Sequence, residues 1–182
     1  MQYFKEIDVE NFDTIVTKTL NYVYEKTDLT TNIPSVEWHE IPLQDFLDNV
    51  PELKTSFEKF NLVPNLIGLV IIYQPNQNKI HRDSYWHSAR INFPILNCER
   101  TFTEFYSGVK FEKTFVIPYN GLSTFKIINS EQDFVFEDRV ELKKATVMRV
   151  HEAHKVVMPD SNPLPRISLS VGFNIDPVFL LD

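Results

Sequence analysis

The fold is decided where the sequence reads Leu66-Ile67-Gly68-Leu69-Val70-Ile71-Ile72-Tyr73, a run without a charged side chain. Its length, and the turn residues that follow at Pro75-Asn76-Gln77-Asn78, are typical of a buried strand that ends in a turn. Beyond it, strand-like segments recur about every ten residues with turn residues between them, which indicates a β-sandwich, a jelly roll or a barrel of about eight strands. The further segments are Ala89–Leu96, Thr101–Tyr106, Thr114–Pro118, Leu122–Ile128, Phe134–Phe136, Ala145–Val150 and Arg166–Phe173.

The residues before this stretch have helical patterns. A helix is predicted over Asn11–Val23, where apolar side chains are spaced for one face. Leu43–Phe60 has a similar apolar stripe, and Pro51 within it predicts two short helices instead of one. Trp38 and His39 stand in an extended segment, and we expect both to pack between helices and sheet. The chain is therefore predicted to be mainly β with N-terminal helices.

Length and composition limit the classes of protein to consider. The chain has 182 residues and a formal net charge of -7. One domain is expected over residues 1–182, with a support region at residues 1–63 and a β core at residues 64–176. The acidic balance, without any Lys/Arg-rich stripe, argues against general nucleic-acid binding. The single cysteine, Cys98, excludes an intramolecular disulfide, and we expect it to be a small buried apolar residue.

The sequence also bears on the compartment. Its first residues lack the apolar stretch of a signal peptide, and its longest apolar runs are too short to span a bilayer. We therefore expect a cytoplasmic protein without a membrane partner. No pattern indicates an oligomeric state.

His81-Arg82-Asp83 is the first candidate for metal binding. Residues i and i+2 of a strand share a face, so this imidazole and this carboxylate can reach one ion. Two His and one carboxylate on one side of a metal form the facial triad of non-haem iron(II) oxygenases, which leaves coordination positions open. The same triplet opens the protein-kinase catalytic loop, but Ser84 and Ser88 stand where that loop needs Leu and Asn.

A second histidine has to come from a distant strand. His151 and His154 are the candidates, and both follow the strand-like segment Ala145–Val150. We favour His154, because a short apolar segment, a Pro/Asn-rich turn and then the strand that begins at Arg166 come after it, which is the order that the site needs.

Two strands offer cations for an anionic ligand. In Arg166–Phe173 the alternation places Arg166, Ser168 and Ser170 on one face, where the guanidinium can form a bidentate pair with a carboxylate. Arg90 and Asn92 similarly share a face of the strand Ala89–Leu96. The alternatives are a surface arginine at Arg166 and a structural ion pair at Arg90.

Taken in order, these residues resemble a known family. His81-Arg82-Asp83, the segment Arg90–Cys98, the segment Thr101–Tyr106, His154 and Arg166-Ile167-Ser168 look like the 2-oxoglutarate/iron(II) dioxygenases over about Leu66 to Phe173. The nearest branch is the aspartyl/asparaginyl hydroxylase-like group with its small phage and bacterial relatives. Each motif is weak singly, and their ordered coincidence on predicted strands is much stronger.

The resemblance implies a double-stranded β-helix, or cupin-like jelly roll, and an oxidoreductase that hydroxylates a substrate. It implies that His81, Asp83 and His154 bind Fe(II), and that Arg166 with Ser168 binds the distal carboxylate of 2-oxoglutarate. Further cosubstrate contacts are implied where that branch has an Arg-x-His pair, here Arg90 and Asn92, and the departure at Asn92 puts the second contact in doubt. Besides O2 and 2-oxoglutarate, the family would use a small-molecule or peptide substrate, with formation of succinate and CO2.

Other residues and functions have to be considered beside this interpretation. Tyr85 and Trp86 follow the metal motif directly and are candidates for substrate contact, or for ordinary packing at a strand end. Tyr106 is expected to pack in the core, and the alternative is that it reaches the cosubstrate pocket. The alternative functions are a cupin-like metal-dependent enzyme that does not use 2-oxoglutarate, and a non-catalytic jelly-roll binding protein.

Overall fold

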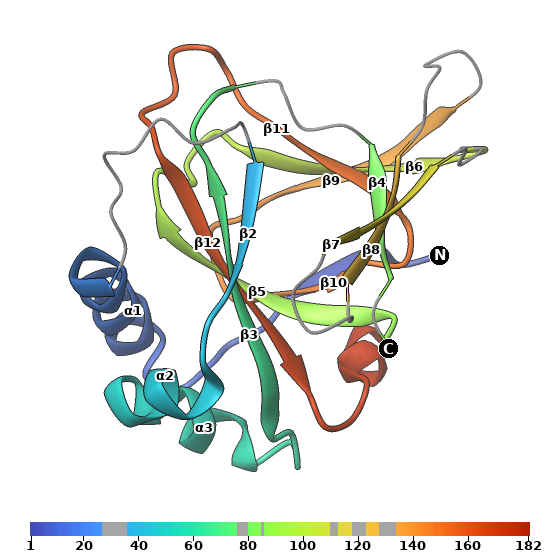
Figure 1. Ribbon diagram of the computed structural model, residues 1–182. Coiled ribbons are helices and arrows are strands. Elements are labelled where there is room, and N and C mark those ends of the chain that lie inside the picture. Colours follow the sequence, from blue (N-terminus) through green and yellow to red (C-terminus); the bar gives the residue numbers. More distant parts are fainter. Residues whose placement is uncertain (27–35, 76–79, 85, 110–112, 118–122, 128–133) are drawn as a thin grey trace.

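A computed structural model describes residues 1–26, 36–75, 80–84, 86–109, 113–117, 123–127 and 134–182 (Figure 1). For residues 36, 37, 84, 113–117 and 123–127 it describes the backbone alone. Most of the turn expected at Pro75-Asn76-Gln77-Asn78 falls outside the described residues.

Within the described residues, the strands form two six-stranded antiparallel sheets. The first sheet has the order β1 (Phe4–Glu6), β10 (Thr146–Arg149), β5 (Ala89–Leu96), β12 (Arg166–Phe173), β3 (Pro64–Ile72) and β2 (Val36–Glu40). The second has the order β7 (Lys113–Ile117), β8 (Ser123–Ile127), β4 (His81–Ser84), β11 (Ala153–Val157), β6 (Phe102–Ser107) and β9 (Val135–Glu141).

The strand pairing identifies the architecture as a jelly roll. Strand β3 pairs with β12, β4 with β11, β5 with β10, and β6 with β9, so the pairs are nested inside one another along the chain. Successive pairs lie alternately in the first and the second sheet, as in a long hairpin that is rolled up. The hairpin β7–β8 is inserted between β6 and β9 and extends the second sheet beside β4. The predicted fold class is therefore confirmed: mainly β, with a double-stranded β-helix.

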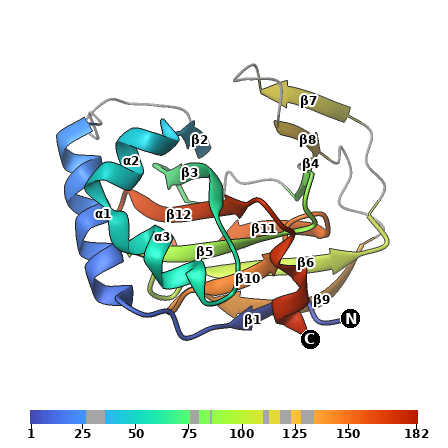
Figure 2. The same cartoon turned by 90° about the horizontal axis from the view of Figure 1, so that it is seen from below.

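Three helices cover one face of the first sheet (Figure 2). They are α1 (Phe12–Lys26), α2 (Leu43–Asn49) and α3 (Pro51–Glu58), and the break between the last two falls at Pro51 as predicted. The main hydrophobic core joins them to the sheet through side chains such as Phe46, Phe57 and Phe93. Each large apolar side chain buried in this way contributes roughly 1.5–3 kcal/mol, so most of the folding free energy is expected to come from this layer.

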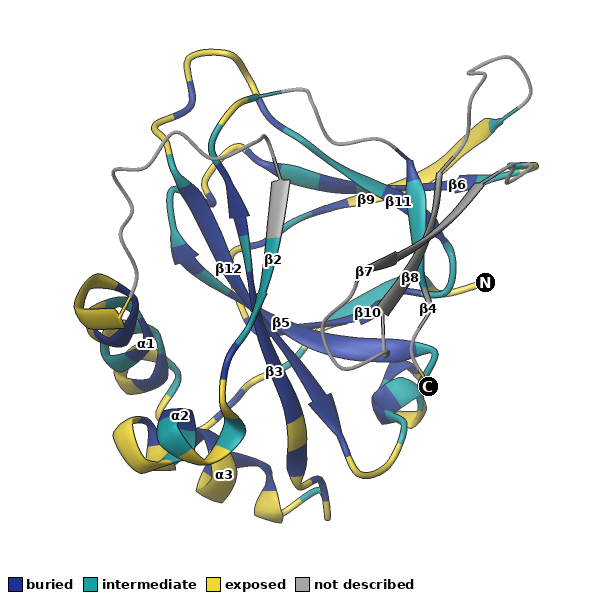
Figure 3. Ribbon diagram, in the orientation of Figure 1, coloured by how far each residue is buried: buried dark blue, intermediate teal, exposed yellow. Residues whose placement is uncertain are grey.

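The opposite face of the first sheet is polar and yet buried. In β12, the side chains of Ile167, Leu169 and Val171 belong to the helix-side core, so alternation turns those of Arg166, Ser168 and Ser170 away from the helices. Every residue of β12 is buried, and Figure 3 shows the buried central strands of this sheet. The polar residues therefore face the second sheet, inside the roll.

A second, smaller core joins residues of the two sheets. It contains Cys98, Phe105 and Met148, with Tyr3 and Phe4 of the N-terminal segment packed against it. Cys98 is buried, so the expectation of a small buried cysteine is confirmed. Its thiol donates to the carbonyl of Ile167 at 3.1 Å.

Three strands are missing from the segments that apolar patterns predicted, although the spacing of His81 and Asp83 was interpreted as that of a strand; two of the three hold the candidate ligands. Strands β1, β4 and β11 are short, and β4 reads His81-Arg82-Asp83-Ser84, which lacks the apolar alternation that marks a strand. His154 does not simply follow the segment Ala145–Val150; it lies in β11, which pairs in the other sheet. Local sequence could not place it, because its partners are distant in the chain.

Candidate metal centre

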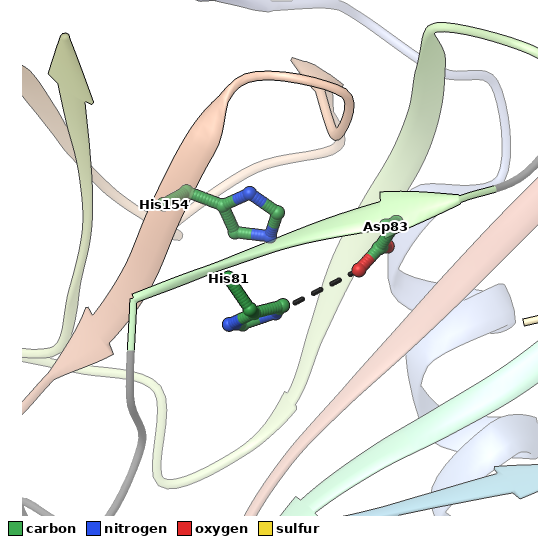
Figure 4. Close-up of side chains that lie close together, drawn as sticks. All are labelled: His81, Asp83 and His154. Carbon is green, nitrogen blue, oxygen red and sulfur yellow. Dashed lines mark ion pairs between the residues drawn. The ribbon is translucent and has the colours of Figure 1, made fainter. Parts of the chain in front are cut away.

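Two paired strands of the second sheet bring three potential metal ligands together. His81 of β4 is the register partner of His154 of β11, and their ring centroids are 4.4 Å apart. Asp83 lies two residues beyond His81 on the same face. Ligand atoms of all three residues lie within 4.8 Å of one another, and the side chains converge in Figure 4. Two imidazoles and one carboxylate are the donor set expected from the sequence.

His154 is oriented by a backbone contact that the sequence did not reveal. Its Nδ1 lies 2.8 Å from the carbonyl oxygen of Glu152. Because a carbonyl can only accept, Nδ1 donates its proton, and the lone pair on Nε2 is left for a metal. Burial, followed by repulsion from His81, lowers the pKa of His154 to about 4. The imidazole is therefore neutral at neutral pH, which is the form that binds a metal ion.

Asp83 is kept ionised by its cationic neighbour. Burial is the largest single influence and would raise the pKa of the Asp83 carboxyl, but Arg90, followed by the neighbouring histidines, acts in the opposite direction, and together they lower this pKa. Nη1 of Arg90 lies 3.8 Å from Oδ2 of Asp83, and Oδ1 of Asp83 lies 3.7 Å from Nε2 of His81. The two carboxylate oxygens thus face different groups, one a histidine ligand and the other a guanidinium.

His151, the other candidate for the second histidine, is half-buried in the turn that precedes β11. Within the described residues it does not belong to the group of close ligands, which consists of His81, Asp83 and His154. The geometry accordingly favours His154 over His151.

Arg166 is a buried cation at the start of β12. Its side chain is 2% exposed, and its Nη1 donates to Oγ of Ser168 at 2.7 Å. Its Nε has no hydrogen-bond partner among the described residues. In the part of the chain that the structure describes, no carboxylate pairs with this guanidinium, so its loss of hydration is unfavourable unless an anion binds to it.

Arg90 and Asn92 lie on the same inward face of β5, and both are buried. The Arg90 guanidinium carbon stands 4.6 Å from the centre of the Trp38 ring. Trp38 thus lies on the inward face and not at the helix interface, so that expectation was wrong. His39, its neighbour in β2, is the register partner of the helix-side residue Leu69, which is compatible with the original expectation for His39.

Tyr85 and Trp86 were suggested for substrate contact, and the structure describes only one of them. Tyr85 lies outside the described residues, and Trp86 is 71% exposed beyond the end of β4. Tyr106 is in a small outer cluster, where its ring meets those of Phe134 and Phe136. Core packing of Tyr106 is therefore confirmed.

Comparison with known proteins finds distant structural likenesses, among them a vicilin and an L-ribose isomerase. No protein family model matches the chain, and no curated protein matches it. Vicilin from Corylus avellana (hazelnut) aligns with a TM-score of 0.39 and 10% identity, over 82% of this chain and 33% of that one. L-ribose isomerase from Cellulomonas parahominis aligns with a TM-score of 0.39 and 12% identity, over 97% and 88% of the two chains. The chain thus spans about a third of the length of the vicilin, and its own nested strand pairs define the fold.

One further structural property concerns membranes. Among the described residues, none of the helices has the length and apolar character needed to cross a bilayer.

Proposed function

We propose that this chain is an Fe(II)- and 2-oxoglutarate-dependent oxygenase that hydroxylates a small-molecule or peptide substrate and forms succinate and CO2. The observation that supports this most strongly is the grouping of His81, Asp83 and His154 on a jelly roll whose opposite inner face has a buried arginine without a carboxylate partner among the described residues. A metal site and an anion site would then share the interior of one fold.

The donor set fits iron. It contains two imidazoles and one carboxylate and no thiolate, and three such protein ligands leave room for a chelating oxo acid and for dioxygen. The ligand atoms of the three residues lie within 4.8 Å of one another, and the side chains would have to draw closer to bind a single ion. When bound, iron and 2-oxoglutarate would supply the oxidising power, and the chain's own residues would bind, orient and exclude water.

Arg166 and Ser168 are proposed to hold the distal carboxylate of the cosubstrate. The guanidinium is fixed by its bond to Ser168 and offers a planar fork, which suits a carboxylate better than the point charge of a lysine would. The buried Asn92 amide is proposed to donate to the carboxylate nearer the metal. Arg90 would add charge there, since its guanidinium already faces Asp83.

Trp86 is proposed to contact the substrate. It follows β4, the strand that contains two of the three ligands, and its indole is largely exposed. An exposed indole offers both a large apolar surface and a hydrogen-bond donor to an incoming molecule.

Anaerobic addition of Fe(II) and 2-oxoglutarate to the protein tests this function. We expect a visible charge-transfer band, and on admission of oxygen slow formation of succinate without any added substrate. Asp83→Ala should abolish both and leave the far-ultraviolet circular dichroism unchanged. Iron binding without any effect of 2-oxoglutarate would instead indicate a metal-dependent enzyme of another kind, and absence of metal binding would indicate a non-catalytic jelly roll.

A further inference from the structure

Two long side chains approach each other across the inward face of the first sheet. Trp38 comes from the edge strand β2, and Arg90 comes from β5, with β3 and β12 between these two strands. The guanidinium carbon of Arg90 is 4.6 Å from the centre of the Trp38 ring. A cation over the face of an indole at this distance is attracted by the ring, most strongly where water is excluded.

The two strands between them have small residues at this level. Gly68 of β3 is the register partner of Ser170 of β12, and Ser170 is in turn the partner of Asn92 in β5. The indole of Trp38 lies directly against Gly68: a Cβ added there would stand 2.2 Å from the Trp38 Cζ2. Cβ atoms essentially never make non-bonded contacts this short, so any larger residue at position 68 would displace the ring. Gly68 therefore provides the space in which Trp38 reaches towards Arg90.

Arg90 in turn faces a metal ligand. Its Nη1 is 3.8 Å from Oδ2 of Asp83, while Oδ1 of the same carboxylate is the atom near His81. Both the Arg90 guanidinium and the Asp83 carboxylate are largely buried, with side chains 2% and 15% exposed. A fixed cation on one oxygen determines how the carboxylate is turned.

We propose that Trp38 and Arg90, in the space left by Gly68, are positioning residues that turn Asp83 so that one oxygen faces the two histidines and the other is held by the guanidinium. This inference rests on the proposed metal site. As a consequence, Asp83 would offer a metal ion a single oxygen, which would leave room beside the three ligands for a chelating cosubstrate and dioxygen. Arg90 then has a definite role beside the ligands, separate from any contact with the cosubstrate.

The test uses variants of the full-length protein that keep its net charge, because removing the Arg90 charge would by itself favour cation binding. The measurement is the dissociation constant for Co(II), followed by the visible absorption of the ion under anaerobic conditions. Trp38→Leu removes the ring, Gly68→Ala displaces it, and Arg90→Lys keeps the charge without the planar group. We expect each to weaken Co(II) binding by about 10- to 100-fold, as changes to groups that orient metal ligands commonly do, and to alter the absorption spectrum.

Two variants separate positioning from general packing. Trp38→Phe keeps an aromatic face and should bind Co(II) within a few-fold of the unchanged protein. Phe12→Leu removes a ring that stacks on Phe93 of β5 at 6.1 Å, on the helix side of the same strand as Arg90. It should lower the thermal midpoint and leave Co(II) affinity unchanged.

The outcomes distinguish this inference from the proposed function. Weak binding by the Leu and Lys variants, with recovery in Trp38→Phe, supports positioning. If the unchanged protein binds Co(II) and these variants bind it equally well, or if Phe12→Leu weakens binding as much as they do, the positioning role is excluded while the metal site stands. If the unchanged protein binds no Co(II), the proposed function and this inference both fall. Should Trp38→Leu not fold, Arg90→Lys and Gly68→Ala decide the matter.

Discussion

Replacement of Arg166 by Met tests whether this arginine binds an anionic ligand or stabilises the fold. The guanidinium is 2% exposed, has one hydrogen bond to Ser168, and keeps an Nε without a partner among the described residues. A buried charge without a counter-ion lowers stability, and an apolar chain of similar length removes that cost. We therefore expect Arg166→Met without ligand to have an unchanged free energy of unfolding, or one raised by about 1–3 kcal/mol.

The same change should remove the response to cosubstrate. A ligand at a hundred times its dissociation constant stabilises a protein by about 2.7 kcal/mol. For a domain of this length that corresponds to a rise in Tm of about 5–10 °C. Loss of two charge-assisted hydrogen bonds, each of about 1.5–3 kcal/mol, weakens binding at least about 100-fold. At a 2-oxoglutarate concentration that gives the unchanged protein the full shift, the variant should thus shift by no more than about 1–2 °C.

The assay is anaerobic differential scanning calorimetry of the iron-loaded protein, with and without 2-oxoglutarate. Ser168→Ala is a milder companion change, because it removes one hydrogen bond to the guanidinium and keeps the charge. It should weaken binding by about 2- to 12-fold. The reasoning is refuted if Arg166→Met is destabilised by more than about 3 kcal/mol without ligand, or if it retains the full thermal shift, because Arg166 would then be structural.

Three further predictions concern His154 and Asp176. His154→Ala should abolish iron binding and His151→Ala should retain it, measured as iron per chain after gel filtration, since only His154 groups with the other two ligands. Folding lowers the pKa of His154 from 6.5 to about 4, so between these pH values the unfolded chain binds more protons than the folded one. The urea midpoint should therefore be constant above pH 6.5 and fall as the pH is lowered from 6.5 towards 4. A midpoint that rises with acidification would contradict this. The Asp176 carboxylate accepts hydrogen bonds from Ser88 N, Ser88 Oγ and Ala89 N. Asp176→Ala should therefore lower the free energy of unfolding by about 1–3 kcal/mol in the same urea assay. An unchanged midpoint would show that these hydrogen bonds do not stabilise the fold.

The elements that sequence patterns predicted well are those that bury apolar side chains. In β5 and β12, alternation identified both the strand and the face, so Arg90 and Arg166 could be assigned to the polar side before the structure was known. The break at Pro51 was equally clear, because proline cannot continue a helix. In β5 and β12 the alternation of apolar side chains is enough to predict a strand, and at position 51 a proline is enough to predict the end of a helix.

The position of Trp38 could not be predicted from its neighbours alone. Alternation shows that Trp38 and His39 point to opposite faces of β2, but the pairing of Trp38 with Val70 decides which face is inward. A signal was nevertheless present in Gly68, a glycine in the middle of an apolar strand, which marks close approach by another group. In the structure the group that approaches Gly68 is the indole of Trp38.

The strands that hold the proposed ligands were the hardest to predict, and the reason is physical. An inward-facing position occupied by His81, Asp83 or His154 cannot also be apolar, so β4 and β11 lack the pattern by which strands are recognised. Their pairing joins residues far apart in the chain and is determined by the nested ladder as a whole. The helix-covered sheet has the large apolar core, and the second sheet can therefore place polar side chains inside the roll. The polar residues that place potential metal ligands in β4 and β11 therefore also remove the local sequence pattern by which these segments would be recognised as strands.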